Sequence, residues 1–178
     1  LDTQRKHSDA AVVFRRAHAA ITARPGGGAE DPMLYVATIG LAQAYEGMQD
    51  FTAAEPVLAA LVPLLRRGPS ADRRDLAGAL TRLGVCLSKL GRPGEAEPVL
   101  REAVAIRRLI EPALWTTAHS VSALGGVLTQ LNRFAEAEPL ILEGYQGLHQ
   151  KRGDIPPHGH SRLGDAAWRV IELYEGWG

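Results

Sequence analysis

The side chains that could do chemistry are thinly spread along this sequence. Of the six histidines only His158 and His160 lie close together, and no cysteine or carboxylate stands at a zinc-binding spacing from them. The single cysteine, Cys86, lies beside an apolar helical stripe and has no adjacent base that would activate a thiolate, so we expect a small buried side chain there. Ser, His and Asp occur without a nucleophile-elbow motif. We therefore predict no catalytic residue, no metal and no cofactor.

Three glutamates recur within the same tripeptide, Ala-Glu-Pro. Glu55, Glu97 and Glu138 are separated by 42 and then 41 residues. A carboxylate in the first turn of a helix interacts favourably with the helix dipole, so this recurrence has a structural reason and needs no catalysis. The proline that follows each glutamate is expected about one turn into a helix, at the loss of one backbone hydrogen bond. The regular spacing indicates an internal repeat.

The sequences that flank the tripeptides match in register. Leucines at 80, 83, 87 and 90 form one stripe of a 3.6-residue helix. The chain then breaks at Gly91-Arg92-Pro93, and a second helix follows with Pro93 at its first position. The same pattern returns at Leu124-Gly125 and, with an alanine for the glycine, at Leu41-Ala42. Each unit is therefore predicted to be two antiparallel helices joined by a tight turn.

The composition favours helices and disfavours a nucleic-acid partner. The chain of 178 residues is 46% hydrophobic but only 6% aromatic, which favours closely packed helices over sheets. Lys plus Arg and Asp plus Glu each number 20, so the positive excess that nucleic acids and anionic membranes require is lacking. The uncharged run 112–132 is long enough to span a bilayer, yet its polar side chains favour a protein-buried helix. We see no secretory signal pattern and expect a cytoplasmic protein.

These repeats resemble the tetratricopeptide repeat, in the 42-residue version found in kinesin light chains. The likeness is carried by the following residues and by their counterparts in the other units: Leu83, Gly84, Leu87, Leu90, Gly91, Ala96, Leu100 and Ala103. The first helices depart from the family in lacking its early aromatic residue, with Thr38, Leu80 and Val121 at that place. The resemblance implies an all-α, right-handed superhelical stack of antiparallel helix pairs, about eight helices in all. It also implies a scaffold that binds a peptide or partner protein in its concave groove and performs no chemistry.

The register extends to both ends of the chain and predicts a single repeat domain. We expect a partial repeat and linker at 1–28, complete repeats at 29–70, 71–111 and 112–152, and a terminal half-repeat or capping helix at 153–178. The segment Pro25-Gly26-Gly27-Gly28 is expected to be a flexible connector, because it lacks the Lys-Ser/Thr of a phosphate-binding loop. The two half-repeats would leave apolar helix faces bare, which favours self-association through them.

The helical phase indicates which side chains would face the groove. If the Leu83-Leu87 stripe faces the second helix of the unit, residues rotated off that stripe line the concave side. We predict that the partner contacts Gln43, Glu46, Thr81, Ser88, His119, Ser122, Thr129, Gln130 and Trp168. Solvated surface is the alternative for these residues, whereas for Trp168 we expect the core of a capping helix rather than a groove contact. The places where related proteins hold a carboxylate clamp carry no charged residue, so that clamp is not expected: Ile39, Gln43, Thr81, Val85, Ser122 and Gly126.

A second resemblance leaves another function open. The segments Leu142–Leu148, Ile155-Pro156-Pro157 and Leu173–Gly178 are similar to the C-terminal end of bacterial serine/threonine protein kinases that carry such repeats behind the kinase domain. None of the motifs Gly-x-Gly-x-x-Gly, His-Arg-Asp or Asp-Phe-Gly occurs in the chain, so no catalytic residue is carried over. The alternative prediction is a regulatory or substrate-recruiting C-terminal repeat tail of a larger bacterial kinase.

Overall fold

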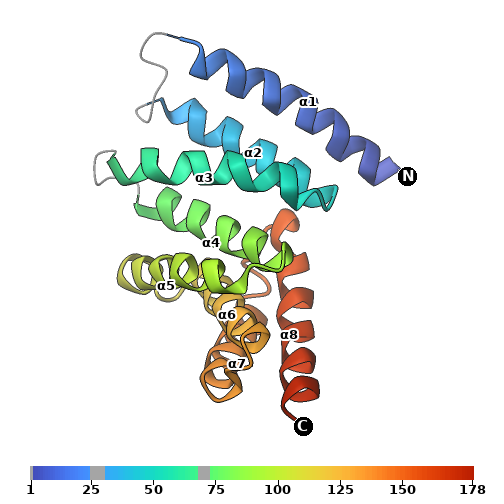
Figure 1. The fold of residues 1–178 in the computed structure, drawn as a ribbon, viewed down its shortest axis with the longest axis vertical. Coiled ribbons are helices and arrows are strands. Elements are labelled where there is room, and N and C mark those ends of the chain that lie inside the picture. The colour runs from blue at the N-terminus through green and yellow to red at the C-terminus, as the bar shows by residue number, and fades with distance from the viewer. Residues whose placement is uncertain (1, 25–30, 68–72) are drawn as a thin grey trace. The chain divides into compact units, whose positions relative to one another are not determined.

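The computed structural model describes residues 2–24, 31–67 and 73–178, and within these ranges the chain contains helices and no strand. The described elements are α1 (Asp2–Thr22), α2 (Pro32–Gly47), α3 (Phe51–Arg67), α4 (Arg73–Lys89), α5 (Pro93–Ile110), α6 (Trp115–Gln130), α7 (Phe134–Gln150), a short 3₁₀ helix (Pro157–Gly159) and α8 (Ser161–Trp177) (Figure 1). The predicted all-α class is confirmed. The connector expected at 25–28 lies outside the described residues.

The helices begin where the sequence supplies suitable first residues. Asp31 caps α2, since its Oδ1 accepts a hydrogen bond of 2.8 Å from the Met33 N–H. Asp50 Oδ1 accepts in the same way from the Ala53 N–H, at 3.0 Å, before α3. Helix α5 begins at Pro93, as predicted. The repeated prolines all lie inside second helices of the pairs, again as predicted: Pro56, Pro98 and Pro139.

The turns between the two helices of each pair share one backbone conformation. The second residue after each first helix has a positive φ, 60° at Gln49, 71° at Gly91 and 58° at Asn132. These residues occupy the same place in the repeat. The left-handed conformation at this place ends a helix and directs the chain into the next one. In two of the turns it allows the return hydrogen bonds Asp50 N–H to Tyr45 O and Arg133 N–H to Leu128 O, both 2.9 Å.

The three Ala-Glu-Pro sites have the same pattern of burial. Each alanine is fully buried, each glutamate is partly exposed and each proline is exposed. The apolar residue one turn after each alanine is also fully buried, namely Leu58, Leu100 and Ile141. The sequence repeat is therefore a structural repeat, in which the same face of every second helix is covered.

The chain divides into two compact units, Leu1–Leu90 and Gly91–Gly178, which we call unit 1 and unit 2. In unit 1 each helix packs against the next along the chain, from α1 to α4. Close approach of α1 and α2 depends on glycine. A Cβ on Gly40 would lie 2.4 Å from the Phe14 ring, and one on Gly47 would lie 2.5 Å from the His7 ring. One core cluster gathers Ala11, Leu41 and Ala44, with Phe14 packed against it.

In unit 2, α6 is enclosed by α5, α7 and α8. Ten of its residues are buried, so the uncharged run 112–132 forms a protein-buried helix, as predicted. No helix in the described ranges is long and apolar enough to cross a membrane. The α6–α7 contact is close because glycines lie there. A Cβ on Gly125 would be 2.5 Å from Ile141 Cγ1, and one on Gly144 would be 2.6 Å from the Ser122 backbone nitrogen.

Candidate partner-binding surface

The nine residues predicted to contact a partner fall into three groups by exposure. Exposed are Gln43, Gln130 and Trp168, partly exposed are Glu46, Ser88 and Thr129, and buried are Thr81, His119 and Ser122. The three buried side chains have almost no surface with which to contact a partner. The other six lie on the surface, three on unit 1 and three on unit 2.

The burial of Thr81 and Ser122 departs from the groove position that helical phase assigned to them. The Thr81 hydroxyl donates to the Ala77 carbonyl of its own helix at 2.7 Å. Ser122 is fully buried because α7 approaches α6 at Gly144 without an intervening side chain. Helical phase gives the direction of a side chain but not the distance to the next helix, which decides whether a small residue is exposed.

Trp168 does not serve as capping core, so that expectation is wrong. Its side chain is 57% exposed, and its Nε1–H donates to Glu172 Oε1 at 2.8 Å along the surface of α8. The core positions of α8 are Ala166 and Leu173, which are both fully buried. They are seven residues apart and thus face the same side of the helix. Trp168 lies far enough around the helix from them to remain accessible.

Within each of the two compact units, an arginine links the first helices of neighbouring repeats. In unit 1, Arg82 of α4 pairs with Glu46 of α2 at 2.7 Å. In unit 2, Arg169 of α8 extends over Gly126 of α6, and its Nη1 donates to Ser122 Oγ at 3.1 Å. Sequence reasoning missed Arg169. Its register offers the signal that could have found it, since aligning Val170 with Leu83 places Arg169 at the position of Arg82.

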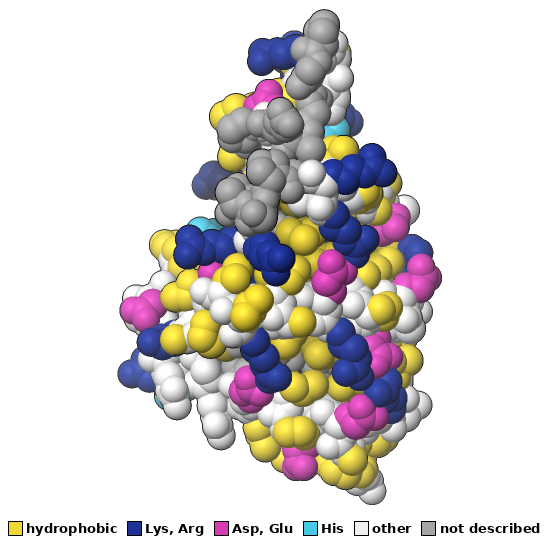
Figure 2. Space-filling view, turned by 90° about the vertical axis from the view of Figure 1, so that its left-hand side faces the viewer, with side chains coloured by type: hydrophobic (Ala, Val, Ile, Leu, Met, Phe, Trp, Pro, Cys, Tyr) yellow, Lys and Arg dark blue, Asp and Glu magenta, His cyan; other side chains and the backbone are white. Residues whose placement is uncertain are grey.

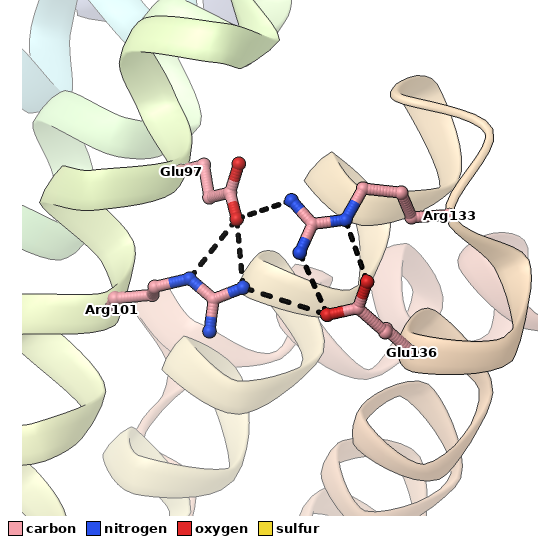
Figure 3. A network of polar contacts seen from close by, with 4 residues as sticks. All are labelled: Glu97, Arg101, Arg133 and Glu136. Carbon is pink, nitrogen blue, oxygen red and sulfur yellow. Dashed lines mark hydrogen bonds and ion pairs between the residues drawn. The ribbon is translucent and has the colours of Figure 1, made fainter.

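A four-residue ion network joins the second helices of unit 2 (Figure 3). Glu97 Oε1 accepts from Arg101 Nη2 on its own helix at 2.7 Å and from Arg133 Nη1 at 2.6 Å. Arg133, which immediately precedes α7, also forms a bidentate pair with Glu136, at 2.8 and 2.7 Å. The network therefore connects α5 to α7 across the repeat boundary. The repeated glutamate has this role in addition to the one predicted from the helix dipole.

The network favours the ionised form of its acids. Hydrogen bonding from Arg101 is the main reason why the pKa of Glu97 lies below its ordinary value, and Arg133 adds to the effect. The pKa of Glu136 is likewise lowered, chiefly by its hydrogen bonds from Arg133. The third repeated glutamate differs, because Glu138 accepts from the Tyr174 hydroxyl at 2.7 Å and thereby raises the pKa of that phenol.

The cysteine and histidine side chains that could do chemistry make contacts that serve the fold. Cys86 is buried, as predicted, and its thiol donates to the Phe51 carbonyl at 3.1 Å. The imidazole Nε2 of His160 lies 2.9 Å from the Ile155 carbonyl oxygen, next to the short 3₁₀ helix. Across the described parts of the chain, no three His, Cys, Asp or Glu residues lie close enough together to hold a metal ion. Figure 2 shows basic and acidic side chains interspersed on the face that it draws.

Comparison with known proteins gives a family match and two structural likenesses. Residues 33–108 match the tetratricopeptide repeat family. The crystal structure of BtubC (BKLC) from P. vanneervenii has 18% sequence identity and a TM-score of 0.64, and the match covers 98% of this chain and 65% of that one. A crystal structure described as a putative kinesin light chain from Podosopora anserina, with nearly identical TPR-like repeats, has 17% identity and a TM-score of 0.69, and the match covers 99% of this chain and 85% of that one. A comparison with curated sequences gives no match.

These findings confirm the resemblance to tetratricopeptide repeats of the kinesin-light-chain type. At identities below 20% the structural likeness shows the fold alone, and the chain spans less than two thirds of BtubC. The tetratricopeptide fold generally mediates contacts between proteins. The resemblance of the C-terminal part to kinase tails receives no support from these comparisons.

Proposed function

We propose that this chain is a non-catalytic protein-interaction module, which binds a partner protein or peptide through exposed side chains on the first helices of its repeats. The observation that carries the proposal is the tetratricopeptide match over residues 33–108, in a chain whose fold is that of such repeats throughout. Stacked helical hairpins of this kind use their exposed side chains for recognition. The equal numbers of acidic and basic residues favour a protein over a nucleic acid as the partner.

The surface on unit 2 suits a peptide with an extended backbone. Gln130 is exposed and Thr129 partly exposed on α6, and both side chains can exchange hydrogen bonds with peptide groups. Trp168 on α8 offers a large apolar area with low conformational entropy, a common feature of binding surfaces. On unit 1, Gln43 is the exposed polar residue of the predicted set.

Affinity capture followed by measurement with purified components tests the proposal. The chain is used to isolate partners from a lysate of its source organism, each partner is purified, and the dissociation constant is measured by calorimetry. Gln130→Ala and Trp168→Ala should weaken binding by about tenfold or more, as expected for residues central to an interface. Gln146→Ala is the matched control, because Gln146 is also an exposed glutamine but lies on a second helix, α7. The assignment of the face would be contradicted if Gln130→Ala and Gln146→Ala weakened binding equally, or if neither variant weakened it.

A C-terminal repeat tail of a bacterial kinase remains the alternative function, and kinase motifs encoded upstream of Leu1 would support it.

Self-association through the terminal half-repeats is a separate prediction. It is supported by the exposed apolar side chains of α8, among them Ile171 at 45% and Trp177 at 45%, and by Val13 on α1 at 64%. A mass that does not rise with concentration in sedimentation would contradict it. A cytoplasmic location is testable by cell fractionation.

A further inference from the structure

Helix α8 is exposed at places of the repeat that are buried in a complete helix pair. Ile171 is 45% exposed and Tyr174 is 47% exposed. In the register that aligns α8 with α6, these residues take the places of Gly125 and Leu128, which are both buried. Helix α7 covers that side of α6, since a Cβ on Gly125 would lie 2.5 Å from Ile141 Cγ1. Helix α8 is therefore a first helix whose side for a second helix is open to solvent.

Helix α1 has the converse property, that of a second helix with an open side. Its Ala10 and Ala17 align with Ala137 and Gly144 of α7. Both α7 residues are buried and contact α6. Ala10 and Ala17, in contrast, are partly exposed, and Val13 between them is 64% exposed. The side of α1 that corresponds to the α6-facing side of α7 is therefore open, while its other side packs against α2.

The two open sides are complementary in side-chain size. In the pair of α6 and α7 the first helix carries the small residue, Gly125, and the second helix the large one, Ile141. On the open sides the order is reversed, because α8 carries Ile171 while α1 carries mainly alanines. Phe14, at the place of Ile141, lies over Gly40 of α2 instead. A second helix like α7 would bring two large side chains together at Ile171, whereas α1 leaves room for it.

The charges beside the two open sides are opposite in sign. The exposed charged residues of α8 are Glu172 and Glu175, and its two arginines are partly buried. Of the α1 side chains that the structure describes, the exposed charged ones are four bases and one acid: Arg5, Lys6, Arg15, Arg16 and Asp9. Opposite charges favour the approach of α1 to α8, and like charges disfavour the pairing of either helix with itself. The charges therefore favour a second copy of this chain as the occupant of each open side.

We propose that α1 of one copy packs antiparallel against α8 of a second copy, which completes a helix pair between the two. The inference rests on the self-association predicted above and adds which surfaces meet. The contact is heterologous, because it joins two different surfaces and leaves one open side on each copy. Copies therefore add one after another, head to tail, until concentration limits the assembly or the copies close into a ring. The contact covers Val13 of one copy and Ile171 of the other.

Two single variants, each with one open side disabled, test the pairing. Val13→Glu disables α1 and Ile171→Glu disables α8, and both replace exposed side chains, so circular dichroism should show an unchanged fold. In sedimentation, the wild-type mass should rise with concentration beyond that of a dimer. Each variant alone should remain monomeric. An equimolar mixture of the two should form a dimer and nothing larger, because together they supply one intact side of each kind.

Leu109→Glu is the matched control, because Leu109 is 72% exposed but lies on α5, outside both open sides. It should associate as the wild type does, and an equal loss of association would overturn the proposal. A dimer formed by Val13→Glu alone would show that α8 pairs with α8 and would also overturn it. Association of the wild type without a dimer in the mixture would overturn this pairing while self-association stands. A wild type that stays monomeric would overturn both, and the capture of a different partner protein is independent of all these outcomes.

Discussion

At the scale of single residues, the same glutamate serves different contacts in different repeats. Glu97 accepts from two arginines, whereas Glu138 accepts from a tyrosine hydroxyl. The position is repeated because it lies near the start of a second helix, where a carboxylate is favoured in any case. The hydrogen-bond donor that reaches this glutamate depends on which side chain of the next repeat lies beside it. A position that recurs in sequence is therefore structurally equivalent without being equivalent in its contacts.

Glu97→Gln should make the stability of the protein less sensitive to acid. The pKa values of Glu97 and Glu136 are lowered in the folded chain, so the unfolded chain binds more protons as the pH falls below the ordinary glutamate value of 4.5. The network thus stabilises the fold above pH 4.5, and this contribution is lost as the pH falls through the lower native pKa values. Urea denaturation between pH 3 and 7 measures the effect. Glu175→Gln, at an exposed position of α8, is the control and should leave the slope unchanged.

At the scale of elements, glycines decide how closely the helices pack. Gly125 and Gly144 allow the backbones of α6 and α7 to approach, and this approach buries Ser122. The turn residues Gln49, Gly91 and Asn132 set the angle between the two helices of each pair through one shared positive φ. Gly125 is the small residue beside the leucine stripe of its repeat, and its missing side chain leaves room for Ile141 of α7.

Gly144→Ala should destabilise the fold by about 1–3 kcal/mol, the usual cost of overpacking a close contact. The added Cβ would lie 2.5 to 2.7 Å from the Ser122 Cβ, nitrogen and Cα, and backbone atoms there cannot move aside without shifting α6. Gly164→Ala is the control within a helix, since a Cβ there meets nothing within 4 Å. It should stabilise by about 0.5–1 kcal/mol through reduced chain entropy. Urea denaturation followed by circular dichroism compares the two, and equal effects would contradict the packing argument.

At the scale of the molecule, each unit contains a core of its own. The fully buried residues of unit 2 come from all four of its helices, including Leu100 on α5, Val121 on α6, Leu148 on α7 and Leu173 on α8. Contacts in repeat proteins are made mainly with nearest neighbours, so stability is distributed along the chain. Helix α8 closes unit 2 by covering both α6 and α7.

The fragment 91–178 should therefore fold without the rest of the chain. We expect a helical circular-dichroism spectrum and a cooperative melting transition, because the helices of unit 2 cover one another. Removing α8 as well, in a fragment that ends at Lys151, should lower the melting temperature markedly, since Leu148 and Ile155 belong to the same cluster as Ala166 of α8. A fragment 91–178 with the spectrum of a random coil would show that unit 2 depends on unit 1.

Much of the fold follows from the sequence because helix formation and repeat register are local. The spacing of the leucines, the break at Gly91 and the recurrence of Ala-Glu-Pro predicted the helix pairs, which are confirmed. The same local pattern predicted that Cys86 is buried. Such patterns depend on 3.6-residue periodicity, which the chain carries regardless of what packs against it.

The partner-binding surface was predicted less well, because it depends on distances between helices. The sequence by itself determined which helix each candidate residue lies on and roughly which way its side chain points. Only the tertiary structure decided that Ser122 is buried, that Trp168 is exposed and that Arg169 faces a hydroxyl where Arg82 faces a carboxylate. Exposure and charge pairing are set by how closely neighbouring helices approach, and a residue's own periodicity carries no information about the side chain that arrives from the next helix.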